Sequence, residues 1–259
     1  MLVKNTLFGV RDKVKDALEM LREFEPEEGY YLAYSGGKDS TVLLDLARRS
    51  GVKFDAHYNL TTVDPPELVY FIRTQPDVII ESPEKTMWEL IVEKGMPPTR
   101  VVRYCCQELK ERGGGGRRVL TGVRRAESAK RAKRQQVESC YKDEHKQYFH
   151  VIFHWSEADV WEYIHSRNLP YCSLYDEGFK RLGCICCPMG NAKNQLRQAE
   201  RWPKFKAQYI RTFQKMVDMR IADGLETSWR TGQDVWDWWV SPKPKKTDEA
   251  RERLEGMVE

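Results

Sequence analysis

Residues 30 to 41 read Tyr-Tyr-Leu-Ala-Tyr-Ser-Gly-Gly-Lys-Asp-Ser-Thr, and this stretch decides the fold. The apolar segment Tyr30–Tyr34 predicts a short buried strand, and the Leu- and Val-rich segment Thr41–Arg49 predicts a helix that ends at Gly51. Between them, Ser35–Ser40 predicts a turn whose two glycines let the backbone approach a ligand closely. Because the free N–H groups at a helix N-terminus favour an anion, we expect a phosphate-binding loop here.

Predicted strands and helices alternate on both sides of this loop. Further strands are expected at Val52–Tyr58, Val78–Glu81, Arg118–Thr121 and, as an apolar run, Tyr148–Phe153. Further helices are expected at Asn5–Phe24, Pro65–Thr74, Thr86–Glu93, Glu157–Ser166 and, bent near Pro203, Ala192–Ala222. This alternation predicts an α/β fold: a mainly parallel twisted sheet with helices on both faces, followed by a helical C-terminal extension.

Size and composition set limits on the kind of protein. The 259 residues suit one large domain with an appendage, and we expect a nucleotide-binding domain over residues 1–190 and a helical extension with a charged tail over residues 191–259. No apolar run approaches the roughly 20 residues that span a bilayer. The first 22 residues lack the apolar region of a signal peptide. We therefore expect a soluble, cytoplasmic protein without a membrane partner.

Positive charge is concentrated in one stretch, although the net charge is only +4. Six basic residues fall within eleven positions and are opposed only by Glu127: Arg124, Arg125, Lys130, Arg131, Lys133 and Arg134. Clustered guanidinium groups suit phosphate or sulfate, but such a stretch can equally be a solvated face. Composition alone leaves both interpretations open.

The seven cysteines are not expected to form disulfides in a cytosolic protein. Cys105 and Cys106 are adjacent, and Cys184 and Cys187 have the C-x-x-C spacing that lets two sulfurs face one metal centre. Two thiolates from each of two distant segments can build a four-sulfur site, so an iron–sulfur cluster is the first interpretation. Zinc and plain buried thiols are the alternatives. Cys186, inside the second pair, could replace Cys184 as a ligand or lie beside the metal.

Ser35–Ser40 resembles the PP-loop of the superfamily that contains ATP pyrophosphatases and sulfonucleotide reductases, in which the loop grips a pyrophosphate, sulfate or phosphosulfate group. Residues 121–128, with the sequence Thr-Gly-Val-Arg-Arg-Ala-Glu-Ser, resemble a Gly-x-Arg-x-x-Glu/Gln-Ser stretch of phosphoadenylyl-sulfate reductases. The segments 154–164 and 174–184 resemble further parts of that family. The resemblance covers roughly residues 28–190.

The resemblance implies an adenine-nucleotide site, which extends the loop by residues elsewhere in the chain. Its expected members are Ser35, Gly36, Gly37, Lys38, Asp39, Ser40, Thr41, Asp64, Gly122, Arg124, Arg125, Ser128 and Arg131. The cysteine pattern resembles the ligand set of adenylyl-sulfate reductases, which implies a 4Fe–4S cluster on Cys105, Cys106, Cys184 and Cys187. The reductases carry a catalytic cysteine near the C-terminus, whereas this sequence has no cysteine after Cys187.

The expected activity is thiol-dependent release of sulfite from adenylyl sulfate or phosphoadenylyl sulfate, with a reductant such as thioredoxin. Lys38, Cys140 and Cys186 are the candidate catalytic residues. One alternative is an ATP-dependent sulfurtransferase that thiolates a nucleic acid or metabolite, for which Mg²⁺ would be needed and Asp39 and Asp64 could help to bind it. A second alternative is a non-catalytic nucleotide-binding accessory protein.

Two further questions stay open at this point. The C-terminal tryptophans could stack nucleic-acid bases, although such residues more often anchor a helix to a core. They are Trp229, Trp236, Trp238 and Trp239. A homo-oligomer is also compatible with the sequence.

Overall fold

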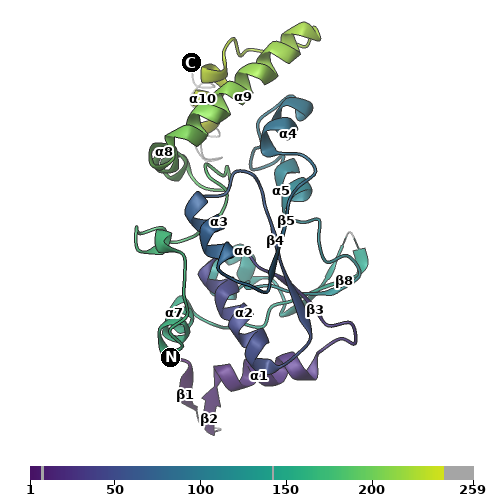
Figure 1. Cartoon of the computed structure of the whole chain (residues 1–259), viewed down its shortest axis with the longest axis vertical. Coiled ribbons are helices and arrows are strands. Elements are labelled where there is room, and N and C mark those ends of the chain that lie inside the picture. The colour runs from purple at the N-terminus through teal and green to yellow at the C-terminus, as the bar shows by residue number, and fades with distance from the viewer. Residues whose placement is uncertain (7–8, 142, 242–259) are drawn as a thin grey trace, which may run out of the picture. The chain divides into compact units, whose positions relative to one another are not determined.

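The computed structural model describes residues 1–6, 9–141 and 143–241 (Figure 1). The chain divides into two compact units. Unit 1 comprises Met1–Glu84 and Cys106–Cys184, and unit 2 comprises Lys85–Cys105 and Ile185–Glu259. The chain thus passes between the units three times, whereas the sequence suggested a single division after residue 190; that domain boundary stays a prediction.

Unit 1 contains a six-stranded sheet in the order β5-β4-β3-β6-β8-β7. Its strands are β3 (Tyr30–Ala33), β4 (Phe54–Asn59), β5 (Val78–Glu81), β6 (Arg118–Leu120), β7 (Val137–Cys140) and β8 (Asp143–Phe149). All neighbouring pairs are parallel except β7 and β8, which form an antiparallel edge. The predicted α/β fold with a mainly parallel sheet is confirmed.

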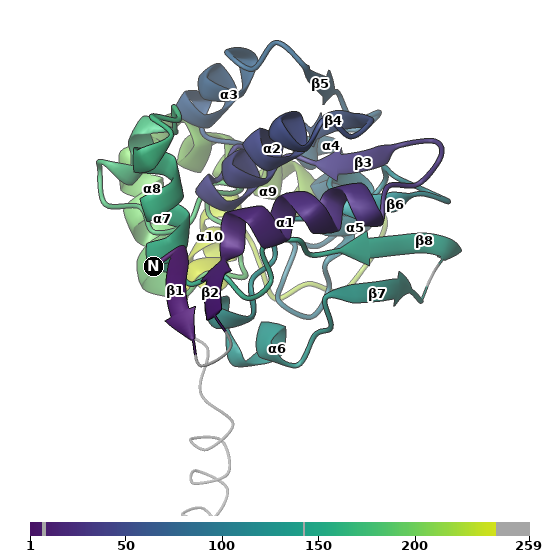
Figure 2. The same ribbon diagram turned by 90° about the horizontal axis from the view of Figure 1, so that it is seen from below.

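The helices of unit 1 follow the strands, as Figure 2 shows from below. They are α1 (Lys13–Glu23), α2 (Lys38–Ser50), α3 (Pro66–Arg73), α6 (Ala129–Ala132) and α7 (Glu157–Ser166), with 3-10 turns η1 (Arg125–Glu127) and η2 (Ser173–Tyr175). The short helix α5 (Tyr104–Leu109) contains the boundary between the units. Apolar side chains of β3 and α2, such as Leu32, Leu43 and Leu46, are completely buried. Their burial fixes the loop between these two elements.

The N-terminal helix is shorter than expected. Helix α1 begins at Lys13, not Asn5, and the preceding residues form a hairpin of β1 (Val3–Thr6) and β2 (Gly9–Asp12). Asp12 accepts hydrogen bonds from the backbone N–H groups of Val14 and Lys15, so its carboxylate caps the helix at that point. The prediction of a helix was wrong at residues 5–6 and 9–12, because apolar spacing was read without the N-cap signal of Asp12. Strand β7 was not predicted, and β8 ends at Phe149 rather than Phe153.

Unit 2 is helical, with α4 (Met87–Lys94), α8 (Ala192–Arg201), α9 (Pro203–Ala222) and α10 (Gly232–Val240). The predicted bend is a break before Pro203. Trp236 and Trp239 are buried beside Tyr209, and Trp239 Nε1 donates to the Pro98 carbonyl at 2.6 Å. These two tryptophans therefore anchor α10 to the helical core. Trp229 and Trp238 pack edge to face with ring centroids 5.1 Å apart.

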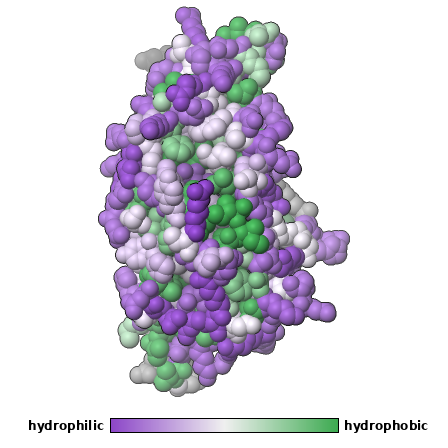
Figure 3. All heavy atoms as spheres, in the orientation of Figure 1, coloured by the Kyte–Doolittle hydropathy of each residue, from purple (hydrophilic) through white to green (hydrophobic). Residues whose placement is uncertain are grey.

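The surface seen in Figure 3 is mostly hydrophilic, with small apolar patches. Among the described residues, no helix combines the length and apolar character that crossing a membrane requires. The charged segment expected as a tail, residues 241–259, lies outside the described residues from position 242 onwards.

Candidate functional site

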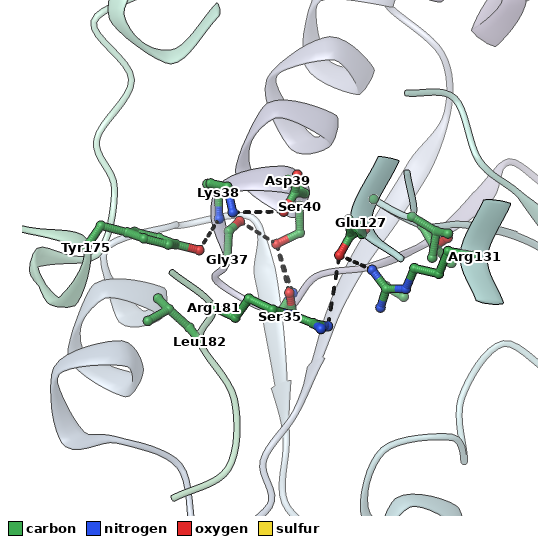
Figure 4. Close-up of a pocket in the computed structure, with 14 residues that line it drawn as sticks. Ser35, Gly37, Lys38, Asp39, Ser40, Glu127, Arg131, Tyr175, Arg181 and Leu182 are labelled. Carbon is green, nitrogen blue, oxygen red and sulfur yellow. Dashed lines mark hydrogen bonds and ion pairs between the residues drawn. The ribbon is translucent and has the colours of Figure 1, made fainter. Parts of the chain in front are cut away.

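A pocket of about 220 Å³ lies in unit 1 where β3 and β6 end and α2 begins (Figure 4). Its lining comes from three separate segments: Ala33, Ser35, Gly37, Lys38, Asp39 and Ser40; Thr121, Gly122, Val123, Glu127 and Arg131; and Tyr175, Arg181 and Leu182. In parallel sheets, ligands bind outside the carboxyl ends of the strands, and this pocket occupies that place. Its volume is below the roughly 300 Å³ of typical small-molecule pockets, so it suits one part of a nucleotide.

The loop Ser35–Ser40 is held by its own hydroxyl groups. Ser40 Oγ donates to the Gly37 carbonyl at 2.9 Å and accepts from the Ser35 N–H at 3.2 Å. Gly36 has φ +68°, and a Cβ there would lie 2.6 Å from the Leu68 side chain. The left-handed conformation and the close approach to α3 both require glycine. The first turn of α2 is thereby directed at the pocket.

Helix α2 starts without a cap from the side chain of its own N-cap residue. Its N-cap residue is Gly37, which has no side chain to bind the first N–H groups. Helices α4, α7 and α10, in contrast, begin with complete capping boxes at Thr86, Ser156 and Thr231. Uncapped N–H groups at a helix N-terminus are suited to bind an anion.

Lys38 is almost fully buried, with 4% of its side chain exposed. Its ammonium group donates to the Lys180 carbonyl at 3.2 Å and lies 3.6 Å from Asp39 and 3.7 Å from Glu157. Its backbone N–H donates to the Tyr175 hydroxyl at 2.8 Å. Lys38 is therefore held at the pocket from both ends.

The carboxylates of the pocket are paired with arginines. Asp39 binds Arg124, with Arg124 Nε 2.5 Å from Asp39 Oδ1. Glu127 forms an ion pair with Arg131 and lies 3.9 Å from Arg181. Because Arg131 and Arg181 both line the pocket, their guanidinium groups can meet an anion while Glu127 keeps them in place.

Thr121 lines the pocket and contacts the fully buried His150. The Thr121 hydroxyl lies 2.6 Å from His150 Nδ1, and His150 Nε2 lies 3.6 Å from Glu138. Burial and the nearby Arg134 lower the pKa of His150 to about 4, so the ring is neutral at pH 7. A neutral ring with its hydrogen on Nε2 accepts the Thr121 O–H at Nδ1, and one with its hydrogen on Nδ1 donates to the Thr121 oxygen, so the tautomer sets the direction of this bond.

The expected nucleotide-site residues divide into two groups. The pocket is lined by Ser35, Gly37, Lys38, Asp39, Ser40, Gly122 and Arg131. The remaining expected residues do not line it: Gly36, Thr41, Asp64, Arg124, Arg125 and Ser128. Several of these support the site instead. Arg124 holds Asp39, Ser128 accepts the N–H of Arg131 at 3.2 Å, and buried Asp64 accepts the N–H of Thr61 at 2.7 Å.

Sequence reasoning missed seven lining residues: Ala33, Thr121, Val123, Glu127, Tyr175, Arg181 and Leu182. Thr121, Val123 and Glu127 lie inside the stretch 121–128, and their place in this stretch could have identified them as lining residues. Nothing in local sequence joins Tyr175 and Arg181 to a loop more than 130 positions earlier.

All seven cysteines lie in the described part of the chain, and none forms a disulfide. Cys105, Cys106, Cys184 and Cys187 are each half-buried. Unit 1 contains Cys106 and Cys184, and unit 2 contains Cys105 and Cys187. In residues 1–6, 9–141 and 143–241, no three Cys, His, Asp or Glu side chains are grouped so that they could hold a metal ion. The cofactor of these cysteines stays a prediction.

The two candidate catalytic thiols have different surroundings. Cys186 is fully buried, and burial raises its pKa to about 12, so its thiolate is disfavoured. Its sulfur lies 3.5 Å from the Gln195 carbonyl. Cys140 is half-buried in β7, where the Tyr148 hydroxyl lies 3.9 Å from its sulfur. Neither residue lines the pocket.

Comparisons with known proteins place these features in a family. The family model described as phosphoadenosine phosphosulfate reductase domain matches residues 29–190. An adenosine 5'-phosphosulfate reductase of Geobacillus kaustophilus is 30% identical over 210 residues, which cover 74% of this chain and 87% of the relative. A reductase with the same description from Oceanobacillus iheyensis is 29% identical over 184 residues, covering 66% of this chain and 75% of the relative.

Two uncharacterised proteins of Methanocaldococcus jannaschii are also similar, each with 29% identity. They match 86% and 80% of this chain, which spans only 54% and 45% of their lengths. Among solved structures, phosphoadenylyl-sulfate reductase from Candida auris, in a phosphate complex, has a TM-score of 0.50 and 20% identity, covering 66% of this chain and 87% of that chain. This likeness supports the fold, and the family match extends over more than half of the sequence. The chain belongs to the phosphoadenosine phosphosulfate reductase domain family.

Proposed function

We propose that the chain binds adenylyl sulfate or phosphoadenylyl sulfate at the pocket and catalyses thiol-dependent release of sulfite. The observation that carries this proposal is the combination of an α2 N-terminus whose N-cap residue is Gly37 with Lys38, Arg131 and Arg181 around one pocket. Helix N–H groups and guanidinium groups stabilise negative charge on phosphate and sulfate oxygens. The family supports a sulfonucleotide as the ligand class.

The proposed reaction balances with two thiols. The thiolate of the first attacks the sulfate sulfur, and the bond from that sulfur to the bridging oxygen breaks. The electron pair of this bond leaves on the nucleotide phosphate, whose new charge the pocket cations stabilise. The second thiol attacks the sulfur of the first, forming a disulfide and releasing sulfite. The sulfate sulfur gains the two electrons that the thiols lose.

The attacking thiol in this proposal comes from outside the chain, from a small molecule or a protein such as thioredoxin. Cys186 is buried with a raised pKa, and Cys140 does not line the pocket. An external thiol therefore agrees best with the environment of the cysteines, and Cys140→Ala should leave sulfite release intact.

We further propose that Cys105, Cys106, Cys184 and Cys187 hold a 4Fe–4S cluster. The chemistry of the donors fits, because four half-buried cysteines outside any disulfide are soft ligands of the kind that iron–sulfur clusters require. A cluster bound there would supply redox-active iron held by these cysteines. Zinc on the same cysteines is the alternative, and metal analysis separates the two.

An ATP-dependent sulfurtransferase is the second candidate, and it is favoured by two carboxylates, Asp39 and Glu127, that line the pocket. Carboxylates beside a phosphate site can bind the Mg²⁺ that accompanies a triphosphate. Asp64, also expected to help, is buried and bonded to the Thr61 N–H. In this candidate, pyrophosphate is released and no sulfite forms.

The deciding experiment offers anaerobically purified protein ATP, adenylyl sulfate and phosphoadenylyl sulfate in turn, with thiol donors, and measures sulfite and pyrophosphate. We expect sulfite from a sulfonucleotide. ATP-dependent pyrophosphate without sulfite would instead establish the second candidate. Nucleotide binding without either product would favour an accessory role.

Arg181→Gln tests whether the pocket described above is where this reaction occurs. We expect about a 10- to 100-fold fall in kcat/KM for the sulfonucleotide, because a charged hydrogen bond to the anion is lost. Arg181 is 69% exposed, so the protein should still fold. Arg73→Gln, an exposed arginine in α3 outside the pocket, is the matched control. Equal rates for both variants would contradict the assignment.

A further inference from the structure

Tyr175 reaches the loop from a distant part of the chain. It ends the 3-10 turn η2, and its hydroxyl accepts the N–H of Lys38, the first residue of α2, at 2.8 Å. A Cβ added to Gly37 would lie 3.4 Å from the same hydroxyl oxygen. Figure 4 shows Tyr175 pointing at Lys38 and Gly37, on the opposite side of the loop from Arg131. The phenol therefore lies directly against the backbone at the helix N-terminus.

This contact changes which donors an anion can meet. The Lys38 N–H would otherwise be available to a ligand, but it is already bonded to Tyr175. The phenol oxygen accepts in this bond, so the hydroxyl hydrogen remains to be donated. Within the described residues, no protein acceptor for that hydrogen is found, and Tyr175 lines the pocket. Burial raises the pKa of Tyr175, so the hydroxyl keeps its hydrogen at neutral pH.

The Tyr175 ring is fixed by its neighbours in unit 1. Trp161 of α7 packs edge to face with it at 5.3 Å between ring centroids, and Tyr171 lies 6.4 Å away. The Lys38 ammonium is 5.4 Å from the ring centroid, within the range of a cation–π contact. A donor that is held in place before the ligand arrives loses little freedom on binding.

We propose that Tyr175 is a ligand-binding residue of this pocket, whose hydroxyl donates to a phosphate or sulfate oxygen in place of the Lys38 N–H. The proposal rests on the proposed function in one respect, namely that an oxyanion occupies the loop. It adds a neutral donor to the charged ones. In the opposite arrangement, Tyr175 blocks the helix N-terminus and must leave when an anion binds. That arrangement predicts tighter anion binding when the Tyr175 hydroxyl is removed.

Tyr175→Phe separates the two arrangements, because it removes the hydroxyl and keeps the ring. The probes are inorganic pyrophosphate and adenylyl sulfate, with dissociation constants measured by calorimetry on the full chain. We expect both to bind about 10- to 100-fold more weakly, the usual loss for one hydrogen bond to a charged group. Tyr171→Phe is the matched control: it removes a hydroxyl that lies 3.1 Å from Asp176, outside the pocket lining.

The possible outcomes are distinct. Unchanged binding by Tyr175→Phe would overturn the proposal, and tighter binding would establish the blocking arrangement. Wild-type protein that fails to bind pyrophosphate would also overturn it. If the wild type binds pyrophosphate but no sulfonucleotide, the proposed function fails while the pyrophosphate data still decide the role of Tyr175. Both variants should remain folded without ligand, as melting curves will show, and Tyr175→Phe should melt at the lower temperature because the Lys38 N–H loses its acceptor.

Discussion

His150 is a fully buried side chain that contacts the pocket residue Thr121, with its Nδ1 2.6 Å from the Thr121 hydroxyl oxygen. Burial keeps its ring neutral at pH 7.

The lowered pKa of His150 predicts acid sensitivity. In the unfolded chain the ring titrates near its ordinary 6.5, but in the folded protein it titrates at about 4. Between these values the unfolded state takes up a proton that the folded state does not, so the free energy of unfolding falls as pH drops from 6.5 to 4. Above pH 6.5, His150 makes no pH-dependent contribution to the free energy of unfolding.

Thermal melting across this pH range checks the prediction. We expect the wild type to lose more stability between pH 6.5 and 4 than His150→Asn, whose amide oxygen can still accept from Thr121. His145→Gln, at an exposed position on β8, should follow the wild type. If the melting temperatures of the wild type and His150→Asn fell in parallel with pH, His150 would be excluded as the source of the acid sensitivity.

At the scale of elements, β3, the loop Ser35–Ser40 and α2 together shape the pocket. The buried strand and helix fix both ends of the loop, and Gly36 lets it turn tightly against α3. Leu68 and Ile72 of α3 lie under Gly36 and are buried. The phosphate loop is therefore part of the core packing as well as part of the site.

Gly36→Ala should destabilise the protein by about 2–5 kcal/mol, because it combines a left-handed backbone with overpacking against Leu68 and Ile72. Urea unfolding measures this change. Gly51→Ala is the matched control: its φ of +76° is similar, but no atom lies within 4 Å of the added Cβ. We expect only about 1–2 kcal/mol there, from the backbone alone. Equal losses would mean that packing against α3 contributes nothing.

At the scale of the whole molecule, the proposed cluster ligands are drawn from both compact units. Each ligand pair in the sequence, residues 105–106 and 184–187, crosses a boundary between the units.

Cys105→Ala should abolish the visible absorbance of anaerobically purified protein and its content of iron and sulfide, since one of four ligands is lost. Cys140→Ala removes an equally half-buried thiol outside the proposed ligand set and should keep the spectrum. An unchanged spectrum in Cys105→Ala would remove this residue from the ligand set, and zinc in place of iron would replace the cluster interpretation.

Much of the fold was predictable because its signals are local. The strand, glycine turn and helix at residues 30–50 follow from apolar patterning and backbone freedom, and so does the break before Pro203. The hairpin ahead of α1 was missed, because apolar residues at positions 7 and 10 fit a helical spacing equally well. Strand β7 has no strong pattern of its own, and its pairing with β8 stabilises it.

The sequence by itself determined the strand, turn and helix at residues 30–50, the parallel α/β fold and the family, because each depends on short contiguous motifs. Only the tertiary structure decided which side chains surround the loop. It paired Arg124 with Asp39, and it brought Tyr175 and Arg181 to the pocket. Such choices depend on packing between segments far apart in the chain, where burial and charge pairing, rather than local spacing, select the neighbours.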